Sequence, residues 1–583
     1  MLVGEQKLTP LPFQRRSSRT ADLPIPSSVY DDELEKEIID ILRTCGTHGA
    51  GISIRRQFKS NVLEHQTRTI VVQTESGKPR ITSSGNEMFH IASITKILIA
   101  AAVIIAIETN SAPNVPEKQY SGFKDIGEEP LTKVYNQNST VKMKAIPENP
   151  TIYHFLTHSR GFLSANHRLF GPCGTPLMAQ TEARDELLSS ITDKEEGADK
   201  NKTWAGYSNV NYVAVALVIE AVWQNSLDTF MNDTLFNRLK MGSTSIGLPA
   251  NRTMGNSGWT VDDQGCLHEI RQPTYRADGA EAAALGAYST VKDLDTFFKF
   301  VIDTFYDSSP LPGFDISGLQ KLLKMTYQAT ELLHFTALGL FTKLDHSTIG
   351  ALSTNRLQFP DELFSTYNVL PKQEECMISV YYMAGSAIGC GCATALHLNE
   401  NEESFVVTVL TDTSGPVDSA DHILRLILQK IAQRPVQGTR PQKPGQLSNV
   451  KHMVNLAMVE SRRKWTKRME KIQYDIEHAP KISKNIEGIF YGDSFSQRLE
   501  ISKRNGKHFI AVKGTSASSA SDEFQLVWVD KNLLRMCVSP HLSVDSLGNG
   551  DWSNLDFKAE GDEQTVTELI RRTASGEDRF LRR

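Results

Sequence analysis

An uninterrupted apolar run that follows directly on a Ser-x-x-Lys sequence constrains the fold of this chain more than any other feature. Ser93 and Lys96 precede the run Ile97 to Ile107. A helix that is apolar on every side must be buried on every side, so we expect it at the centre of the molecule, packed on a sheet. The run is about half as long as a membrane-spanning helix needs to be.

Ser93 and Lys96 have the chemistry of an activated nucleophile. Residues three apart in a helix share one face, so the hydroxyl and the amine would be neighbours. An unprotonated lysine can accept the serine proton, and a helix N-terminus favours the negative charge that develops beside the serine. Burial under the apolar helix would lower the pKa of Lys96 and keep its amine neutral. The alternative is a capping residue followed by a solvated lysine.

A second apolar helix begins with residues that could assist this pair. Tyr207-Ser208-Asn209 precedes the apolar run Tyr212 to Val222. Tyr207 could relay the proton of the nucleophile, and Asn209 could hold Lys96 or a substrate carbonyl. The alternative for Tyr207 is a buried tyrosine at the start of a helix.

A later strand could supply the oxyanion hole. Val380 to Ser386 has the pattern of a β-strand that ends in small residues. The backbone N–H groups of Ser386 and Ser93 would together bind the oxyanion of an acyl-transfer intermediate. The alternative is a core strand in which glycine allows close packing.

In this order, these segments resemble the serine hydrolases related to class C β-lactamases, penicillin-binding proteins and family VIII esterases. The resemblance covers roughly residues 35–430 and includes Phe155 to Gly161, Leu239 to Thr244, Gly286 to Leu294 and Phe405 to Asp412. It implies an α+β fold, in which helices flank an antiparallel sheet that carries an all-helical insert. It also implies catalysis by Ser93, Lys96 and Tyr207 without a cofactor. In the family's pattern His158 is a hydrogen-bonded core histidine rather than the base of a catalytic triad.

One motif departs from the family's pattern. Most relatives carry Lys-Thr-Gly or His-x-Gly where this chain has Met383-Ala384-Gly385. We expect these three residues and Asn209 to contact substrate. The missing cation normally faces a substrate carboxylate, a contact that contributes on the order of 1.5–3 kcal/mol. Because family VIII esterases also have an apolar residue there, the departure favours an uncharged ester or thioester over antibiotics and cell-wall peptides.

The predicted reaction is acyl transfer through a serine ester, with a small-molecule ester, thioester or amide as acyl donor. Water as acceptor would give hydrolysis, and an alcohol would give transesterification. The stretches Ala387 to Gly391 and Thr411 to Gly415 resemble long fungal-type relatives, which implies a role in secondary-metabolite (polyketide or terpenoid) biosynthesis. Two alternatives remain: an inactive scaffold that binds a partner, and a β-lactamase or peptidase that acts on carboxylate-bearing amides.

Changes in composition divide the chain into four parts. We expect a disordered leader at 1–30, the catalytic domain at 31–432, a Pro/Gly/Gln linker and a long helix at 433–480, and a small β-barrel at 481–583. The barrel resembles the lipocalin-like appendage that some members of the family carry. The barrel would cover the site or mediate contacts. In the first two ordered parts we expect helices at 31–42, 93–108, 418–432 and 450–474, a turn at 49–51, strands at 52–54, 69–73, 337–352, 377–397 and 404–412, and a mostly helical region at 110–330.

Charge and cysteine content exclude several classes of function. The net charge is −5, and the one basic stretch, 461–468, is interrupted by apolar residues, so we expect no binding of nucleic acid. The seven cysteines are scattered, which predicts reduced thiols and no metal site. No secretory signal is evident at the N-terminus, so we expect a cytoplasmic protein without membrane insertion. The oligomeric state is not predicted.

Overall fold

The computed structural model describes 28–109, 127–178 with gaps, Arg184, 207–248, 258–306 with gaps, short stretches between 326 and 367, 380–400, 403–433, 448–492, 497–515, 523–537 and 555–583 except 574–575. Almost all of the expected leader at 1–30 and of the linker at 433–448 lies outside these residues. Both therefore stay predictions.

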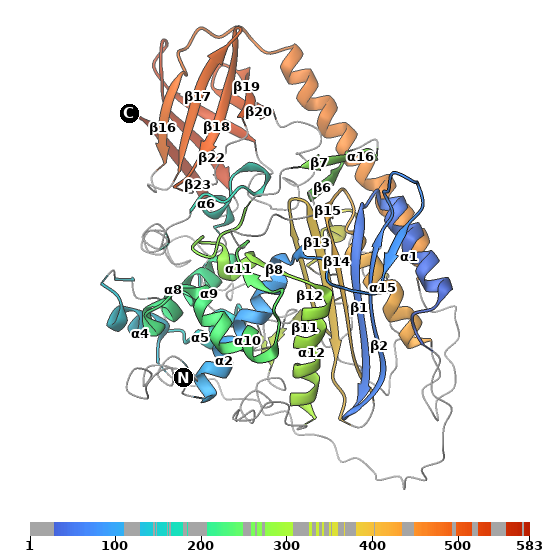
Figure 1. Ribbon diagram of the computed structural model, residues 1–583. Coiled ribbons are helices and arrows are strands. Elements are labelled where there is room, and N and C mark those ends of the chain that lie inside the picture. The colour runs from blue at the N-terminus through green and yellow to red at the C-terminus, as the bar shows by residue number, and fades with distance from the viewer. Residues whose placement is uncertain are drawn as a thin grey trace.

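A nine-stranded antiparallel sheet forms the centre of the catalytic domain (Figure 1). Its central strands come from both ends of the domain sequence, as expected, because β1 pairs with β14 along eight residues. In spatial order the strands are β3 (Arg80–Thr82), β2 (Asn61–Val71), β1 (Gly49–Phe58), β14 (Ser404–Thr411), β13 (Cys390–His397), β12 (Val380–Ala387), β11 (Phe341–Thr342), β10 (His334–Thr336) and β9 (Thr326–Gln328).

One sequence-based expectation about this sheet is wrong, and another falls mostly outside the described residues. The segment 49–51 is the beginning of β1 and not a turn. Gly51 is needed for close packing, since a Cβ there would lie 2.9 Å from the ring of Phe89. Within the range 337–352, where strands are expected, the structure describes β11 and a turn at 349–350. Most of the remaining residues of that range lie outside the described part of the chain.

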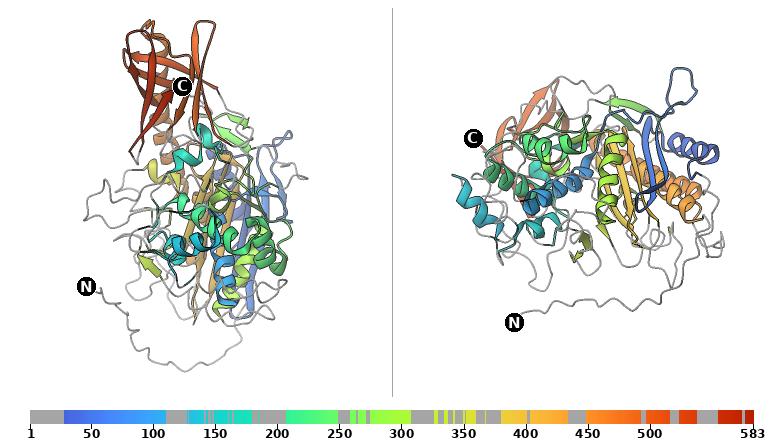
Figure 2. Two further views of the ribbon diagram at one scale, coloured as in Figure 1. Left: turned by 90° about the vertical axis from the view of Figure 1, so that its left-hand side faces the viewer. Right: turned by 60° about the horizontal axis from the view of Figure 1, so that its bottom comes forward.

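Helices cover both faces of the sheet and define two hydrophobic cores (Figures 1 and 2). On one face, α1 (Asp32–Cys45) and α15 (Ser419–Ala432) pack together, and α16 (Val450–Glu477) contacts both. On the other face, α12 (Val291–Phe305) crosses β1 and β14. Beyond α12 lies α2 (Thr95–Thr109), the apolar helix singled out in the sequence. All its residues from Ile97 to Ala106 are buried, as its composition predicts.

The insert around α2 is mainly helical but also contains short strands, which the expectation of an all-helical insert missed. Its strands β4 (Phe89–His90), β8 (Ala287–Ser289) and β5 (Ser245–Ile246) form a small sheet. Pairing with β8 in this sheet provides backbone hydrogen bonds for β4, the strand that leads into the turn containing Ser93. The described helices of the insert are α4 (Leu131–Asn138), α5 (Ile152–Leu156), α6 (Asn166–Leu169), α8 (Asn209–Trp223), α9 (Leu227–Met231), α10 (Asn237–Leu239) and α11 (Ala282–Leu285).

The C-terminal region is a closed eight-stranded barrel, which α16 connects to the catalytic domain (Figure 2, left). Its core contains three residues of the catalytic domain, Leu177, Ile270 and Ile388, so the barrel packs directly on that domain. The barrel strands are β16 (Gly488–Gly492), β17 (Arg498–Arg504), β18 (Lys507–Lys513), β19 (Glu523–Asp530), β20 (Leu533–Cys537), β21 (Asp556–Gly561), β22 (Val566–Thr573) and β23 (Gly576–Arg582).

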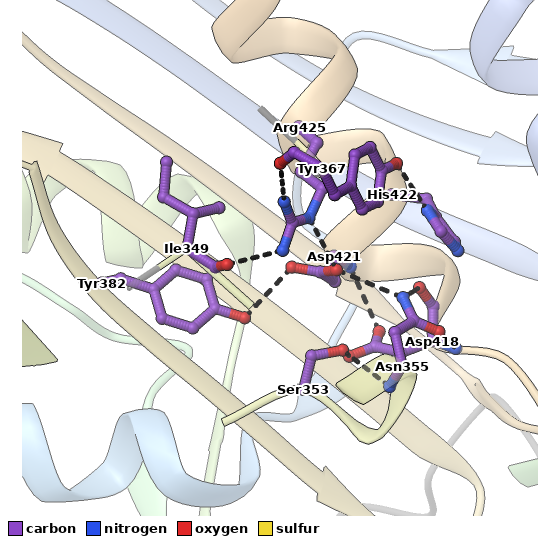
Figure 3. Close-up of polar contacts among 9 residues, drawn as sticks. All are labelled: Ile349, Ser353, Asn355, Tyr367, Tyr382, Asp418, Asp421, His422 and Arg425. Carbon is purple, nitrogen blue, oxygen red and sulfur yellow. Dashed lines mark hydrogen bonds and ion pairs between the residues drawn. The ribbon is translucent and has the colours of Figure 1, made fainter. Parts of the chain in front are cut away.

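A buried polar network holds β12 from the α15 side of the sheet (Figure 3). Tyr382 of β12 donates to Asp421 of α15 at 3.2 Å, and Asp421 pairs with Arg425 at 2.9 Å. Asp418 accepts a hydrogen bond from Ser353 at 2.7 Å. Burial and the neighbouring Asp421 raise the pKa of Asp418 to about 7. The network fixes the strand that carries Met383 to Ser386.

Among the described residues, no helix combines the length and apolarity that crossing a bilayer requires. The side chains of five cysteines are described, and all five are free thiols. Four of them are buried and Cys266 is exposed.

Candidate active site

Ser93 lies in a strained turn at the start of the central helix. The 3-10 turn Ala92–Ile94 joins β4 to α2, so Ser93 precedes the α-helix rather than belonging to it. Ala92 has φ of 41°, a left-handed conformation that is unfavourable for a residue with a side chain. Such strain persists where the surroundings enforce it, and it often marks functional sites.

Two side chains converge on the Ser93 hydroxyl. Lys96 Nζ lies 3.1 Å from Ser93 Oγ, and the Tyr207 hydroxyl donates to the same oxygen at 2.6 Å. Tyr207 lies two residues before α8, which is buried nearly throughout and packs against α11. Of the three residues expected to carry catalysis, Lys96 and Tyr207 are therefore each within hydrogen-bonding distance of Ser93.

Lys96 is buried in surroundings that favour a neutral amine. Its side chain is completely buried, and Nζ donates to the carbonyl oxygen of Ala284 at 2.5 Å. The rings of Tyr207 and Tyr212 lie 4.7 and 5.5 Å from Nζ. Among the described residues Lys96 has no carboxylate partner, and burial holds the pKa of its amine well below the usual value. A neutral amine can donate to Ala284 and still present its lone pair to Ser93.

Tyr207 is held as a neutral phenol. Burial is the main cause that raises the pKa of its hydroxyl. Its ring packs on His158 with a centroid distance of 4.6 Å. His158 is buried, as expected, and its Nδ1 accepts from the N–H of Ser208 at 3.3 Å. Because burial, and then the nearby Lys96, lower the pKa of His158, this imidazole is neutral and supports the tyrosine ring.

The strand β12 approaches the nucleophile at Gly385. A Cβ on Gly385 would lie 2.5 Å from the backbone nitrogen of Ser93, so only glycine fits there. The next residue, Ser386, is exposed, whereas its neighbours on β12 are buried. The chain thus brings the Ser386 peptide next to the Ser93 backbone, at a point open to solvent.

Three other residues expected to contact substrate, Asn209, Met383 and Ala384, are buried or nearly buried. Asn209 donates to Asn166 at 2.9 Å and makes no contact with Lys96, while its Oδ1 is buried without a partner among the described residues. Met383 is completely buried, in the same core as the nucleophile turn. Ala384 belongs to the core on the opposite side of the sheet, so only its backbone can face Ser93.

Sequence reasoning missed several groups around the site. The carbonyl of Ala284 holds Lys96, and that of Leu285 accepts from His90 Nε2 at 2.6 Å. Burial lowers the pKa of His90 to about 4. No side-chain motif could have identified these carbonyls, because every residue carries one. The buried thiol of Cys392 was also missed, because the sequence predicts only that the cysteines are reduced and does not show which of them lies beside the site.

A second unexpected group is the carboxyl of Glu281, the residue that precedes α11. Burial raises the pKa of Glu281 to about 8. In the described part of the chain, no three His, Cys, Asp or Glu side chains form a group that could hold a metal ion.

A family model described as beta-lactamase matches residues 66–429. This chain therefore belongs to the beta-lactamase family, whose α+β fold it shares. A sequence comparison with curated proteins returned no match.

Comparison with solved structures gave distant similarities. The octameric penicillin-binding protein homologue from Pyrococcus abyssi is 14% identical, with 94% of this chain and 99% of that chain covered and a TM-score of 0.46. A class C beta-lactamase from Rhodobacter sphaeroides is 15% identical, with 69% and 99% covered and a TM-score of 0.47. A D-stereospecific amidohydrolase from Streptomyces sp. is 15% identical, with 70% and 100% covered and a TM-score of 0.45. Similarity at this level carries no statement about activity.

Proposed function

We propose that this protein is a serine hydrolase or acyltransferase that forms an acyl ester on Ser93. The observation that carries the proposal is the position of Ser93 Oγ between a completely buried lysine amine at 3.1 Å and a tyrosine hydroxyl at 2.6 Å. A neutral lysine beside a serine is costly to bury and serves to accept the serine proton.

The residues account for both halves of the reaction. Ser93 Oγ attacks the substrate carbonyl while Lys96 accepts its proton, with Tyr207 in the hydrogen-bonded path. The N–H groups of Ser93 and Ser386 stabilise the oxyanion, which can be worth about 3–4 kcal/mol per donor. Tyr207 then protonates the leaving group and regains a proton from Lys96. In the second half, water or an alcohol attacks the acyl ester, its proton returns through the same groups, and Ser93 is released.

The apolar strand beside the nucleophile supports an uncharged substrate. Met383 is buried on the Ser93 side of the sheet and cannot make a charge-assisted contact with a carboxylate. We therefore assign a neutral small-molecule ester or thioester as acyl donor. The resemblance to long fungal-type relatives supports secondary-metabolite biosynthesis as the context.

Turnover of matched substrates tests this proposal. We expect purified protein to hydrolyse neutral short-chain aryl esters or acyl thioesters far faster than penicillins or D-Ala-D-Ala peptides, and the Ser93→Ala variant to be inactive. Met383→Lys should raise the relative rate on carboxylate-bearing substrates, with Met383→Leu as its matched control. The gain should be small, because the new lysine loses hydration where Met383 is now buried. Efficient penicillin hydrolysis by the unmodified protein would favour the β-lactamase alternative, and inactivity on every substrate would favour the scaffold.

A further inference from the structure

A buried thiol lies directly behind the candidate oxyanion hole. Cys392 of β13 is completely buried, and its Sγ is 3.0 Å from the carbonyl oxygen of Ile91 and 3.3 Å from that of Gly385. The first carbonyl belongs to the turn that carries Ser93, and the second belongs to β12. The thiol thus bridges the two segments that present the oxyanion donors.

The contact with Gly385 has a specific geometric consequence. The carbonyl of Gly385 and the N–H of Ser386 belong to one planar peptide group, in which they point in opposite directions. A donor that holds this carbonyl therefore also fixes the direction of the N–H. Hydrogen bonds to the two ends of one amide polarise each other, so the thiol also strengthens the N–H as a donor.

We propose that Cys392 is a positioning residue, whose thiol orients the Ser386 peptide and sets its separation from the Ser93 turn. The proposal rests on the proposed function, in which the N–H groups of Ser93 and Ser386 bind the oxyanion. The three parts pack tightly, since a Cβ on Gly385 would lie 2.5 Å from Ser93 N and 2.9 Å from Cys392 Sγ. A displacement of the thiol would therefore shift the N–H groups of both Ser93 and Ser386.

A neutral thiol suits this position because it donates without adding charge. Burial holds the pKa of the Cys392 thiol well above its usual value, so it stays protonated. A thiolate there would repel both carbonyls. It would also raise the pKa of Lys96 and so keep the catalytic amine protonated.

Substitution of Cys392 tests the proposal through the transition state. An arylboronic acid that bonds to Ser93 forms a tetrahedral adduct whose oxygen would occupy the oxyanion hole. For Cys392→Ala we expect kcat to fall about tenfold or more and the boronate Ki to rise by a similar factor, while KM changes less than about twofold. Cys392→Ser, which keeps a donor, should recover part of both losses.

Two buried thiols provide controls. Cys45→Ala removes a buried thiol from the other core, and Cys390→Ala removes one whose contact is His90 at 3.2 Å. Both should keep kcat and the boronate Ki near wild-type values, with all variants checked by thermal unfolding. Equal effects of Cys392→Ala and Cys45→Ala, or a loss that resides only in KM, would overturn the proposal.

A readout without turnover separates this proposal from the proposed function. In protein labelled with ¹⁵N-serine, the Ser386 amide signal, assigned with Ser386→Ala, should shift in Cys392→Ala and stay in place in Cys45→Ala. An unchanged Ser386 signal refutes the positioning role even in an active enzyme. A shifted signal supports it, and inactivity of wild-type protein on every ester would then count against the function alone.

Discussion

At the scale of single residues, the site depends on Lys96, a lysine whose complete burial is energetically unfavourable. Lys96 lies at the start of a buried apolar helix, where its amine must lose a proton as the chain folds. Each unit by which folding lowers a pKa costs about 1.4 kcal/mol. In the proposed mechanism this loss of stability is the cost of a neutral base next to Ser93, a trade-off that active sites commonly show.

The lowered pKa of Lys96 predicts how the substitution Lys96→Met changes the free energy of unfolding. The unfolded chain binds a proton at Lys96 below its ordinary pKa, and the folded chain does not until the pH falls to the lowered pKa. Lower pH therefore destabilises wild type relative to Lys96→Met, by about 1.4 kcal/mol per pH unit between those two pKa values. Urea unfolding of both proteins at pH 9 and pH 7 measures this difference. A difference that does not change with pH would show that Lys96 is charged in the folded protein.

Tyr207→Phe separates the hydroxyl from the ring. The variant loses the 2.6 Å hydrogen bond to Ser93 but keeps the ring that packs on His158 and Lys96. We expect kcat/KM on a neutral ester to fall about 10²–10⁴-fold, as for other proton-transfer groups, with little change in the melting temperature. His158→Gln serves as a control that alters the packing of the ring and keeps the hydroxyl. A Tyr207→Phe variant with nearly full activity would rule out a proton relay through Tyr207.

The sequence was informative about residues that belong to local motifs. Ser93 and Lys96 are three residues apart and Tyr207 lies just before an apolar helix, so their proximity could be predicted, and the structure places Lys96 and Tyr207 beside Ser93. The contacts of Lys96 with Ala284 and of Cys392 with Gly385 could not be predicted. Each contact joins a side chain to a backbone carbonyl of another segment, and the residue type does not reveal which carbonyl will accept a hydrogen bond.

At the scale of elements, the approach of β12 to the nucleophile turn depends on Gly385. We predict that Gly385→Ala abolishes activity and lowers stability by about 1–3 kcal/mol, because its Cβ would lie 2.5 Å from Ser93 N. Gly242→Ala is the matched control, since a Cβ there meets nothing within 4 Å. Activity and thermal unfolding of both variants measure the effect. An active, stable Gly385→Ala variant would contradict the close approach.

Periodicity predicted most of the elements and failed where packing overrides local preference. The hairpin at 377–397 and the helix at 418–432 follow clear patterns and are present as β12, β13 and α15. The glycines at 49 and 51 resemble a turn but lie in β1, and at Gly51 the ring of Phe89 leaves no room for a side chain. Such contacts arise only after distant segments have come together.

At the scale of the whole molecule, the barrel packs next to the site. Ile388, two residues beyond Ser386, belongs to the barrel core together with Leu177 and Ile270. Among the described residues, the other members of that core come from the barrel and the residues just before it. We still expect a chain that ends at residue 480 to fold, with these three apolar side chains and Ile472 of α16, which packs on Val527 and Cys537 of the barrel, newly exposed.

Leu177→Asp tests this coupling in the full-length protein. The charge would be buried in the barrel core, so we expect the barrel to undock and calorimetry to resolve two unfolding transitions in place of one. Ester turnover should fall as well, because Ile388 loses its packing. Ile489→Asp, on a side chain that is 39% exposed on the barrel, should change neither. A single unchanged transition in Leu177→Asp would show that the barrel does not depend on this contact.

The central claim is that Ser93 carries the acyl group, and intact-protein mass spectrometry of an acid-quenched reaction tests it most directly. During turnover of a neutral aryl ester, we predict a mass increase equal to the acyl group, located by peptide mapping on the fragment that contains Ser93, and its absence in Ser93→Ala. Turnover without any adduct in wild-type protein, or an adduct that persists in Ser93→Ala, would contradict the account.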